Sequence, residues 1–254
     1  MTQLEFAYAD PLTTDAPEGF LSLRAGASRR DIRLAFALMA GYAAVVLALF
    51  PWATLHGPSI PQSVAVFTTG IIVAEFATAC LLLTLTGDKP DWLVLFVSCA
   101  YLFSSLMGIA HVLTFPGAVL PDRPLLGGAQ LTSYGFNAWR IGFAILILIA
   151  VLVPDRKGEM STSAWRRIVK ACWYAIVVLV AIGFVAALTF ERSLPVAVMS
   201  GEFTGVGLAL SWIAAALGAF ALASLLIKTR GRQVLHLWLI LAMTTLRRSF
   251  FEHV

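Results

Sequence analysis

The chain has 254 residues, of which 59% are hydrophobic and only 13% are charged, and its mean hydropathy is +0.86. Soluble domains carry about 25% charged residues, so a water-soluble core cannot absorb this much apolar surface. The composition therefore predicts a protein whose main solvent is the lipid bilayer. The formal net charge of +4 gives no reason to expect nucleic-acid binding, because the basic residues follow a membrane topology, as described below.

The first segment, residues 1–33, is polar and is interrupted by Pro11, Pro17 and Gly19. It lacks an apolar core followed by a cleavage site, so we interpret it as a cytoplasmic tail and not as a signal peptide. A bilayer core about 30 Å thick then needs about 20 mostly apolar residues per helix. Six later segments meet this requirement: 34–55, 64–86, 92–115, 136–153, 171–190 and 204–227. Because an open strand edge cannot be satisfied in lipid, the predicted fold class is all-α, a polytopic transmembrane helical bundle.

A partial seventh span covers residues 234–246 and stops at Arg247 and Arg248. Its length is about 20 Å at 1.5 Å per residue, which is too short for a full crossing. One explanation is a re-entrant or interfacial helix. The other, which we favour, is that a longer protein has been cut or shifted in frame near residue 246, which leaves residues 247–254 as a short atypical tail.

The distribution of lysine and arginine predicts the orientation. With the N-terminus inside, the inner segments hold 13 of these residues and the outer segments hold 3. Cytoplasmic loops carry such an excess of positive charge. The N-terminus is therefore expected in the cytoplasm, and the loop after Phe115-Pro116-Gly117, which ends the third span, is expected on the outer face.

Ionisable groups at membrane depth are costly and point to function. Glu75 lies near the middle of the second span and is expected to be protonated or paired, with His111 and Arg140 as candidate partners. Asn137 lies one turn before Arg140 in the fourth span. The topology places all four groups in the outer half of the bundle. They form either a polar pocket open to the outside or to the outer leaflet, or a structural cluster that holds the helices together.

Motifs of soluble enzymes are missing from the sequence, which has no G-x-S-x-G, no P-loop and no G-x-G-x-x-G. No histidine or cysteine pair has metal-binding spacing, and His111 and His236 are predicted on opposite sides of the membrane. The sequence therefore predicts a protein that is not an enzyme and has neither a metal site nor a cofactor.

Two stretches, YLFSSLMGIAHVLTFPGAVLP and LLGGAQLTSYGFNAWRIGFAILIL, resemble the integral-membrane sensor domains of the MASE group, specifically its fourth-described type. The resemblance extends over residues 34–246. The positions that match the family pattern are His111, Thr114, Phe115, Pro116, Gly117, Gln130, Trp139 and Phe143. The family pattern often has histidine where this chain has Arg140, which implies a fixed cation here in place of a titratable group.

The resemblance implies a sensory input module of the bacterial inner membrane, which receives an unknown small ligand and acts on a cytoplasmic diguanylate cyclase or histidine kinase. The family has about eight spans followed by an output domain, whereas this chain is expected to lack its own output domain. The alternatives are a non-catalytic accessory membrane subunit and a small transporter using Glu75. The candidate ligand-binding residues are Glu75, His111, Gln130, Asn137, Trp139 and Arg140.

Overall fold

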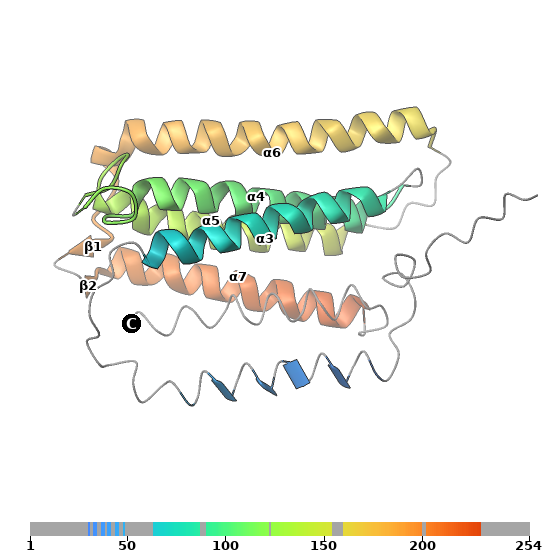
Figure 1. The fold of residues 1–254 in the computed structure, drawn as a ribbon, viewed down its shortest axis with the longest axis horizontal. Helices are drawn as coiled ribbons and strands as arrows, with labels where there is room; N and C mark the ends of the chain where they lie inside the picture. The colour runs from blue at the N-terminus through green and yellow to red at the C-terminus, as the bar shows by residue number, and fades with distance from the viewer. Residues whose placement is uncertain are drawn as a thin grey trace, which may run out of the picture.

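The computed structural model describes isolated positions between residues 30 and 48 and the ranges 63–86, 90–121, 123–153, 160–199 and 202–229. Five long helices make up this part of the chain (Figure 1): α3 (Ser63–Thr86), α4 (Trp92–Thr114), α5 (Ala129–Leu152), α6 (Thr162–Phe190) and α7 (Gly205–Thr229). All five are long and apolar enough to cross a membrane. A multi-pass helical membrane protein is therefore confirmed.

Five of the predicted spans correspond to these helices, and the remaining two are not confirmed. The predicted first span, 34–55, is described only at isolated positions, and the partial seventh span lies outside the described residues. The same is true of the expected tails, apart from Arg30 and Arg33 in the first of them. The count of six full spans and a partial seventh stays a prediction.

Helix α4 is the centre of the described bundle, because it packs against α3, α5 and α6, while α7 packs against α5. Of the five spans, α4 has the largest share of buried residues and α6 has the smallest. Helix α6 accordingly lies at the edge of the bundle (Figure 1) and exposes apolar side chains such as Val178, Ile182 and Val185. Such a surface is suited to contact with lipid acyl chains.

Glycines allow two of these helix contacts to be close. A Cβ at Gly142 of α5 would overlap the ring of Phe103 on α4, and a Cβ at Gly108 of α4 would lie 2.8 Å from Cγ1 of Ile72 on α3. Small residues at helix crossings let backbones approach in this way in membrane bundles. They fix α3 and α5 against the two sides of α4.

Two helices begin earlier than the sequence predicted. Helix α5 starts at Ala129 and not at 136, and α6 starts at Thr162 and not at 171. The first turns of both helices are too polar to be counted as part of an apolar span. The start of α6 is capped by Ser161, whose Oγ accepts the Ala164 N–H at 3.3 Å. Trp165 is fully buried in the first turn of α6, with its ring centroid 5.2 Å from that of Trp92.

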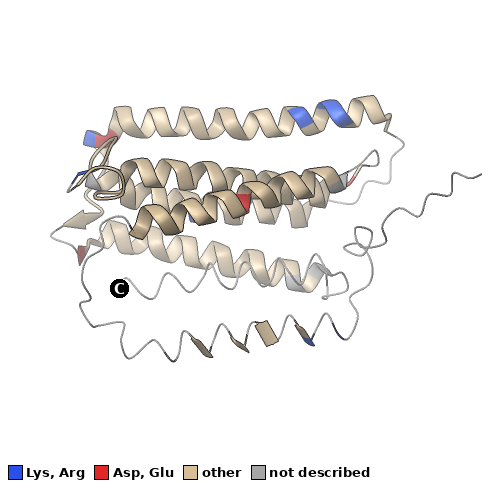
Figure 2. Ribbon diagram, in the orientation of Figure 1, with Lys and Arg blue, Asp and Glu red and all other residues tan. Residues whose placement is uncertain are grey.

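This early start brings into α6 three basic residues that precede residue 171, where the predicted span begins. Arg166, Arg167 and Lys170 lie within α6. In Figure 2 they are the blue part of α6 near its beginning, while the middle of the bundle is almost free of charged residues. The charge of this region therefore lies in the first three turns of α6.

The opposite end of the bundle carries the structured connections. Helix α4 ends at Thr114, one residue before the predicted end. Its C-cap residue Phe115 donates its N–H to the His111 carbonyl at 2.9 Å, and Gly117 has a positive φ of 83°. Between α6 and α7 the chain forms a 3-10 turn, η3 (Glu191–Ser193), and two short antiparallel strands, β1 (Val198–Met199) and β2 (Glu202–Phe203). This hairpin has only two residues in each strand, so the described part of the chain is helical and the predicted all-α class is confirmed.

Candidate ligand-binding site

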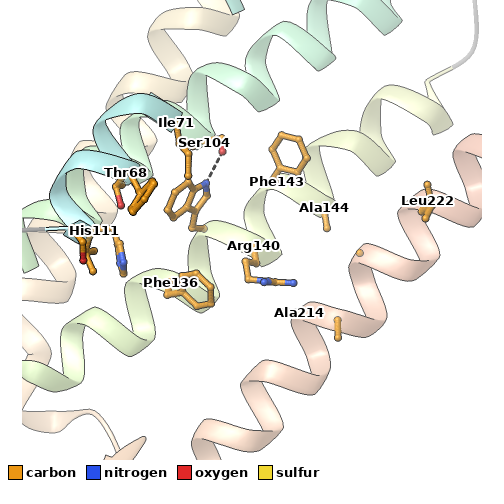
Figure 3. Close-up of a pocket in the computed structure, with 16 residues that line it drawn as sticks. Thr68, Ile71, Ser104, His111, Phe136, Arg140, Phe143, Ala144, Ala214 and Leu222 are labelled. Carbon is orange, nitrogen blue, oxygen red and sulfur yellow. Dashed lines mark hydrogen bonds between the residues drawn. The ribbon is translucent and has the colours of Figure 1, made fainter. Parts of the chain in front are cut away.

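A cavity of about 390 Å³ lies between α3, α4, α5 and α7. Figure 3 shows that it is lined mainly by apolar and aromatic side chains, with a few polar groups from α3, α4 and α5. Its size falls within the range of small-molecule sites, about 300–1,000 Å³. Such sites in helical bundles are built from side chains on facing helices.

The face that α5 turns to the cavity follows from helical spacing. Phe136, Arg140 and Ala144 are four residues apart, and Trp139 and Phe143 are four residues apart beside them, so all five lie on one face of the helix. The sequence of α5 therefore supplies one wall that is aromatic along most of its length and carries a single guanidinium group.

His111 lies in an aromatic setting at the cavity. Its ring centroid is 5.5 Å from that of Phe115, 5.8 Å from that of Phe136 and 6.0 Å from that of Trp139. Its Nδ1 is buried and has no hydrogen-bond partner among the described residues. A buried polar atom without a partner is costly, so this nitrogen is available to a ligand group that can donate to it or accept from it.

Arg140 also lines the cavity, with its guanidinium carbon 5.5 Å from the centroid of the Phe136 ring. This distance is typical of a cation–π contact. Figure 3 shows the side chain extending from α5 toward α7. Because α5 begins at Ala129, Arg140 lies about 16 Å from the start of the helix, in its fourth turn. The sequence prediction had placed it only one turn into the span.

A hydrogen-bonded chain connects the cavity wall to Glu75. Trp139 Nε1 donates to Ser104 Oγ at 2.5 Å, and Ser104 Oγ donates to Glu75 Oε1 at 2.7 Å. All three side chains are buried. Trp139 and Ser104 line the cavity and Glu75 does not, so the Ser104 hydroxyl connects the cavity lining to the carboxyl group.

Ser104 therefore corrects the predicted partner of Glu75. The sequence suggested His111 or Arg140, whereas the hydrogen-bond partner in the structure is a serine of α4. The second carboxyl oxygen, Glu75 Oε2, is buried without a hydrogen-bond partner among the described residues. Sequence reasoning missed Ser104, although a Ser-Ser pair in the middle of an apolar helix is a signal that could have drawn attention to it.

Asn137 lies outside the cavity lining and connects helices. Its Nδ2 donates to the carbonyl of Ser133 at 3.0 Å, and its Oδ1 accepts from Ser211 Oγ of α7 at 3.5 Å. The side chain is 2% exposed. These contacts fit the structural alternative that the sequence had left open, a polar group that holds two helices together.

Gln130 also lies outside the cavity lining, at the hairpin end of α5. Its Oε1 accepts the N–H groups of Ala197 and Val198 at 2.8 and 3.1 Å, and its Nε2 donates to the Val198 carbonyl at 2.5 Å. A single amide side chain thus fixes β1 to α5. The six predicted site residues therefore divide into His111, Trp139 and Arg140 at the cavity, Glu75 behind it, and Asn137 and Gln130 elsewhere in the bundle.

The α5 N-terminus receives a second contact from the same linker. Glu191 Oε1 accepts the N–H of Gly128, the residue before the helix, at 2.7 Å. A carboxylate at a helix N-terminus is favoured by the helix dipole. Tyr134 Oη donates to the Pro195 carbonyl at 2.8 Å, so the α6–α7 linker is held to the first two turns of α5.

Within the part of the chain that the structure describes, no group of three or more His, Cys, Asp or Glu side chains is placed to hold a metal ion. The groups available for chemistry at the cavity are an imidazole, a guanidinium and hydroxyls. This set can bind a small molecule by hydrogen bonds and charge.

The fold and the cavity define the class: a multi-pass helical membrane protein with a small-molecule-sized space inside the bundle. Comparison with known families then identifies the family. The MASE4 family, described as "Membrane-associated sensor, integral membrane domain", matches residues 58–251, and the chain belongs to it. The predicted resemblance is thereby confirmed. No curated protein and no solved structure matches the chain significantly.

Proposed function

We propose that this protein is a sensory input module of the bacterial inner membrane and that the cavity between α3, α4, α5 and α7 is its ligand site. Membership of a membrane-associated sensor family supports the general role. The observation that carries the site is a cavity of about 390 Å³ that brings His111 and Arg140 to one aromatic wall. The proposal assigns no catalytic activity to the chain.

The hydrogen-bonded chain offers a route from the ligand to the helices. A ligand that displaces Trp139 changes its bond to Ser104, and through Ser104 it changes the bond to Glu75, so α5, α4 and α3 are coupled. A ligand shifts such an equilibrium only by binding one arrangement better than the other. In this proposal the N-terminus is cytoplasmic, and the rearranged helix ends act on a cytoplasmic signalling protein, a diguanylate cyclase or a histidine kinase.

A cavity-filling substitution tests the proposal. Ala215 lines the cavity, whereas its neighbour Ala216 is exposed and does not. Ala215→Trp and Ala216→Trp are therefore a matched pair on α7. Each replaces the chromosomal copy in the host bacterium, and transcripts are compared with those of the wild type and of a deletion strain. For the genes whose transcript levels change on deletion, Ala215→Trp is expected to hold the transcript level at its lowest or highest value. Ala216→Trp is expected to give the wild-type transcript levels.

The competing functions give different results. If Ala215→Trp behaves as the wild type while deletion changes expression, the protein acts without the cavity, as an accessory subunit would. If Glu75→Gln abolishes ion flux through proteoliposomes that contain the wild-type chain, the protein is a transporter. Either result would overturn the proposed sensory role of the cavity.

A further inference from the structure

The α5 and α7 sides of the cavity differ in the size of their side chains (Figure 3). The α5 side carries three aromatic rings, and the α7 side is built mainly from alanine and glycine. The rings are those of Phe136, Trp139 and Phe143, and the α7 residues are Ala214, Ala215, Gly218 and Leu222. A Cβ at Gly218 would have no neighbouring atom within 4 Å. The small residues therefore leave space beside the aromatic side, and a flat ring can occupy it.

Contacts within the protein hold the aromatic side in place. Trp139 Nε1 donates to Ser104 Oγ at 2.5 Å, and the ring centroids of Trp139 and Phe136 are 6.5 Å apart in an edge-to-face arrangement at 85°. The imidazole of His111 lies 5.8 Å from the Phe136 ring and 6.0 Å from the Trp139 ring, between centroids. Aromatic pairs prefer edge-to-face and offset-stacked arrangements. This group of three rings is therefore suited to a further ring beside it.

Polar groups are distributed among the apolar groups of the lining. Thr68 is adjacent to the apolar residue Phe67 on α3, and His111 lies among aromatic rings. The hydroxyl group of Ser104 is bonded to the Trp139 indole. Such a mixed lining fits a compact ring that carries oxygen atoms at its edges. A polar head joined to a separate apolar tail would instead require a lining divided into two parts.

His111 supplies a hydrogen-bonding atom for such a ring. It lines the cavity, and its buried Nδ1 has no hydrogen-bond partner among the described residues. A neutral imidazole has one N–H donor and one acceptor nitrogen, and either nitrogen can carry the hydrogen. Nδ1 can therefore donate to a ring carbonyl or accept from a ring hydroxyl. Either hydrogen bond removes the cost of a buried polar atom that has no partner.

The cavity opens on the flank of α3. Phe67 and Ile71 line the cavity, and their side chains are also 74% and 45% exposed. They lie about 6 and 12 Å along a helix that is apolar enough to cross the membrane. The opening thus faces the bilayer, and a ligand that already dissolves in lipid reaches it without passing through water.

We infer that the ligand is a lipid-soluble quinone or its quinol, whose ring lies beside the aromatic side of α5 and forms a hydrogen bond with Nδ1 of His111. The carbonyl oxygens of a quinone accept and the hydroxyl groups of a quinol donate, so the imidazole can pair with both forms. The hydrocarbon tail extends through the opening beside Phe67 into the bilayer. Arg140 interacts with other groups of the protein, including the Phe136 ring, and its charge has no part in this inference. The inference rests on the proposed function of the same cavity and adds the chemical class of its ligand.

Photolabelling tests the inference. The full chain is reconstituted in nanodiscs of neutral lipid, incubated with a decyl benzoquinone that carries an azido group on its ring, irradiated and mapped by mass spectrometry. Adducts are expected on α5 and α7 within the cavity. Unlabelled decylubiquinone is expected to compete at least about fivefold more effectively than decylbenzene, which has the ring and the tail but no oxygen atom to pair with His111. Palmitate, which has no ring, is also expected to compete less effectively than decylubiquinone.

Three variants provide the controls. His111→Phe keeps an aromatic ring and removes Nδ1, so labelling is expected to weaken about fivefold. Ala215→Trp fills the cavity and is expected to abolish labelling there, whereas Ala216→Trp lies outside the lining and is expected to leave labelling unchanged. The comparison of unlabelled competitors needs no variant, so it remains decisive if a substitution impairs folding.

The outcomes separate this inference from the proposed function. Equal competition by decylubiquinone and either decylbenzene or palmitate would overturn the quinone class. Adducts confined to the lipid-facing surface of α6 would overturn quinone binding in the cavity, and transcript levels held at one extreme in Ala215→Trp would still support sensing of another ligand there. Cavity labelling with wild-type transcript levels in Ala215→Trp would instead support the ligand class and overturn the sensory function.

Discussion

Trp139 on α5 and Glu75 on α3 are joined through one hydroxyl group, that of Ser104 on α4. The direction of the chain is fixed by the indole, whose N–H can only donate. Ser104 Oγ accepts from Trp139, which leaves its own hydrogen for Glu75 Oε1. Three helices therefore share one polar connection in the buried interior of the bundle, and the carboxyl oxygen is an acceptor in it.

The first prediction concerns this hydroxyl. Ser104→Ala removes one acceptor and one donor and leaves both Trp139 Nε1 and Glu75 Oε1 without the partner they have in the structure. The free energy of unfolding is expected to fall by about 1–2 kcal/mol, since buried polar groups without partners are costly even when the reference state is within a membrane. Equilibrium unfolding of the full chain in mixed micelles with increasing sodium dodecyl sulfate measures this change.

Glu75→Gln is the matched variant for Ser104→Ala. It keeps an oxygen that accepts from Ser104, so its expected loss is below about 1 kcal/mol. A larger loss for Glu75→Gln than for Ser104→Ala would contradict the arrangement, because the carboxyl group would then be held by something other than this hydroxyl.

The second prediction concerns the close contact between α4 and α5. Gly142→Ala introduces a Cβ that overlaps the Phe103 ring, which must move out of its packed position. Overpacking of this kind costs about 1–3 kcal/mol. Gly183→Ala on α6 is the control, because nothing lies within 4 Å of its Cβ position. Alanine has a helix propensity up to about 1 kcal/mol better than glycine, so the control is expected to be neutral or stabilising in the same unfolding assay.

The third prediction concerns the hydrogen bonds by which Gln130 of α5 holds the hairpin. Gln130→Ala removes the acceptor of two backbone N–H groups and the donor to the Val198 carbonyl. Hydrogen exchange at Ala197 and Val198 is expected to become roughly 5–10 times faster, equivalent to about 1 kcal/mol of lost protection. Mass spectrometry of peptides that cover residues 194–204 measures it. Tyr134→Phe removes only the hydrogen bond to the Pro195 carbonyl and is expected to leave these two amides protected. Unchanged exchange in Gln130→Ala would show that Gln130 does not hold the hairpin to α5.

The sequence was sufficient to predict three of the residues at the cavity. Arg140 and His111 are unusual within apolar helices, and a histidine or an arginine at membrane depth has to find a polar environment or a cavity. Trp139 was predicted from its match to the family pattern and not from its local environment. The apolar length of each span likewise predicted five helices of the bundle.

Other features depend on contacts that no local pattern encodes. A serine in a membrane helix is inexpensive, because hydroxyl groups can donate to a carbonyl of their own helix, as Thr78 does to Ala74. The Ser-Ser pair of α4 was therefore only a weak signal, and it did not indicate which residue Ser104 contacts. The contacts of Gln130 reach residues 67 and 68 positions away. The same polar first turn that makes those contacts lowered the hydropathy of residues 129–135, which explains why the predicted helix began too late.

The last prediction concerns orientation, which the proposed signalling route requires. Ser163 and Ser193 are both exposed and lie near opposite ends of α6. A background in which Cys80, Cys99 and Cys172 are replaced by alanine receives either Ser163→Cys or Ser193→Cys. If the N-terminus is cytoplasmic, a membrane-impermeant maleimide is expected to label Ser193→Cys in intact spheroplasts and Ser163→Cys only after permeabilisation. The basic residues Arg166, Arg167 and Lys170 beside Ser163 favour this result, because positive charge is retained on the cytoplasmic side. The reverse pattern would place the hairpin end of the bundle toward the cytoplasm, and the proposed direction of signalling would have to be abandoned.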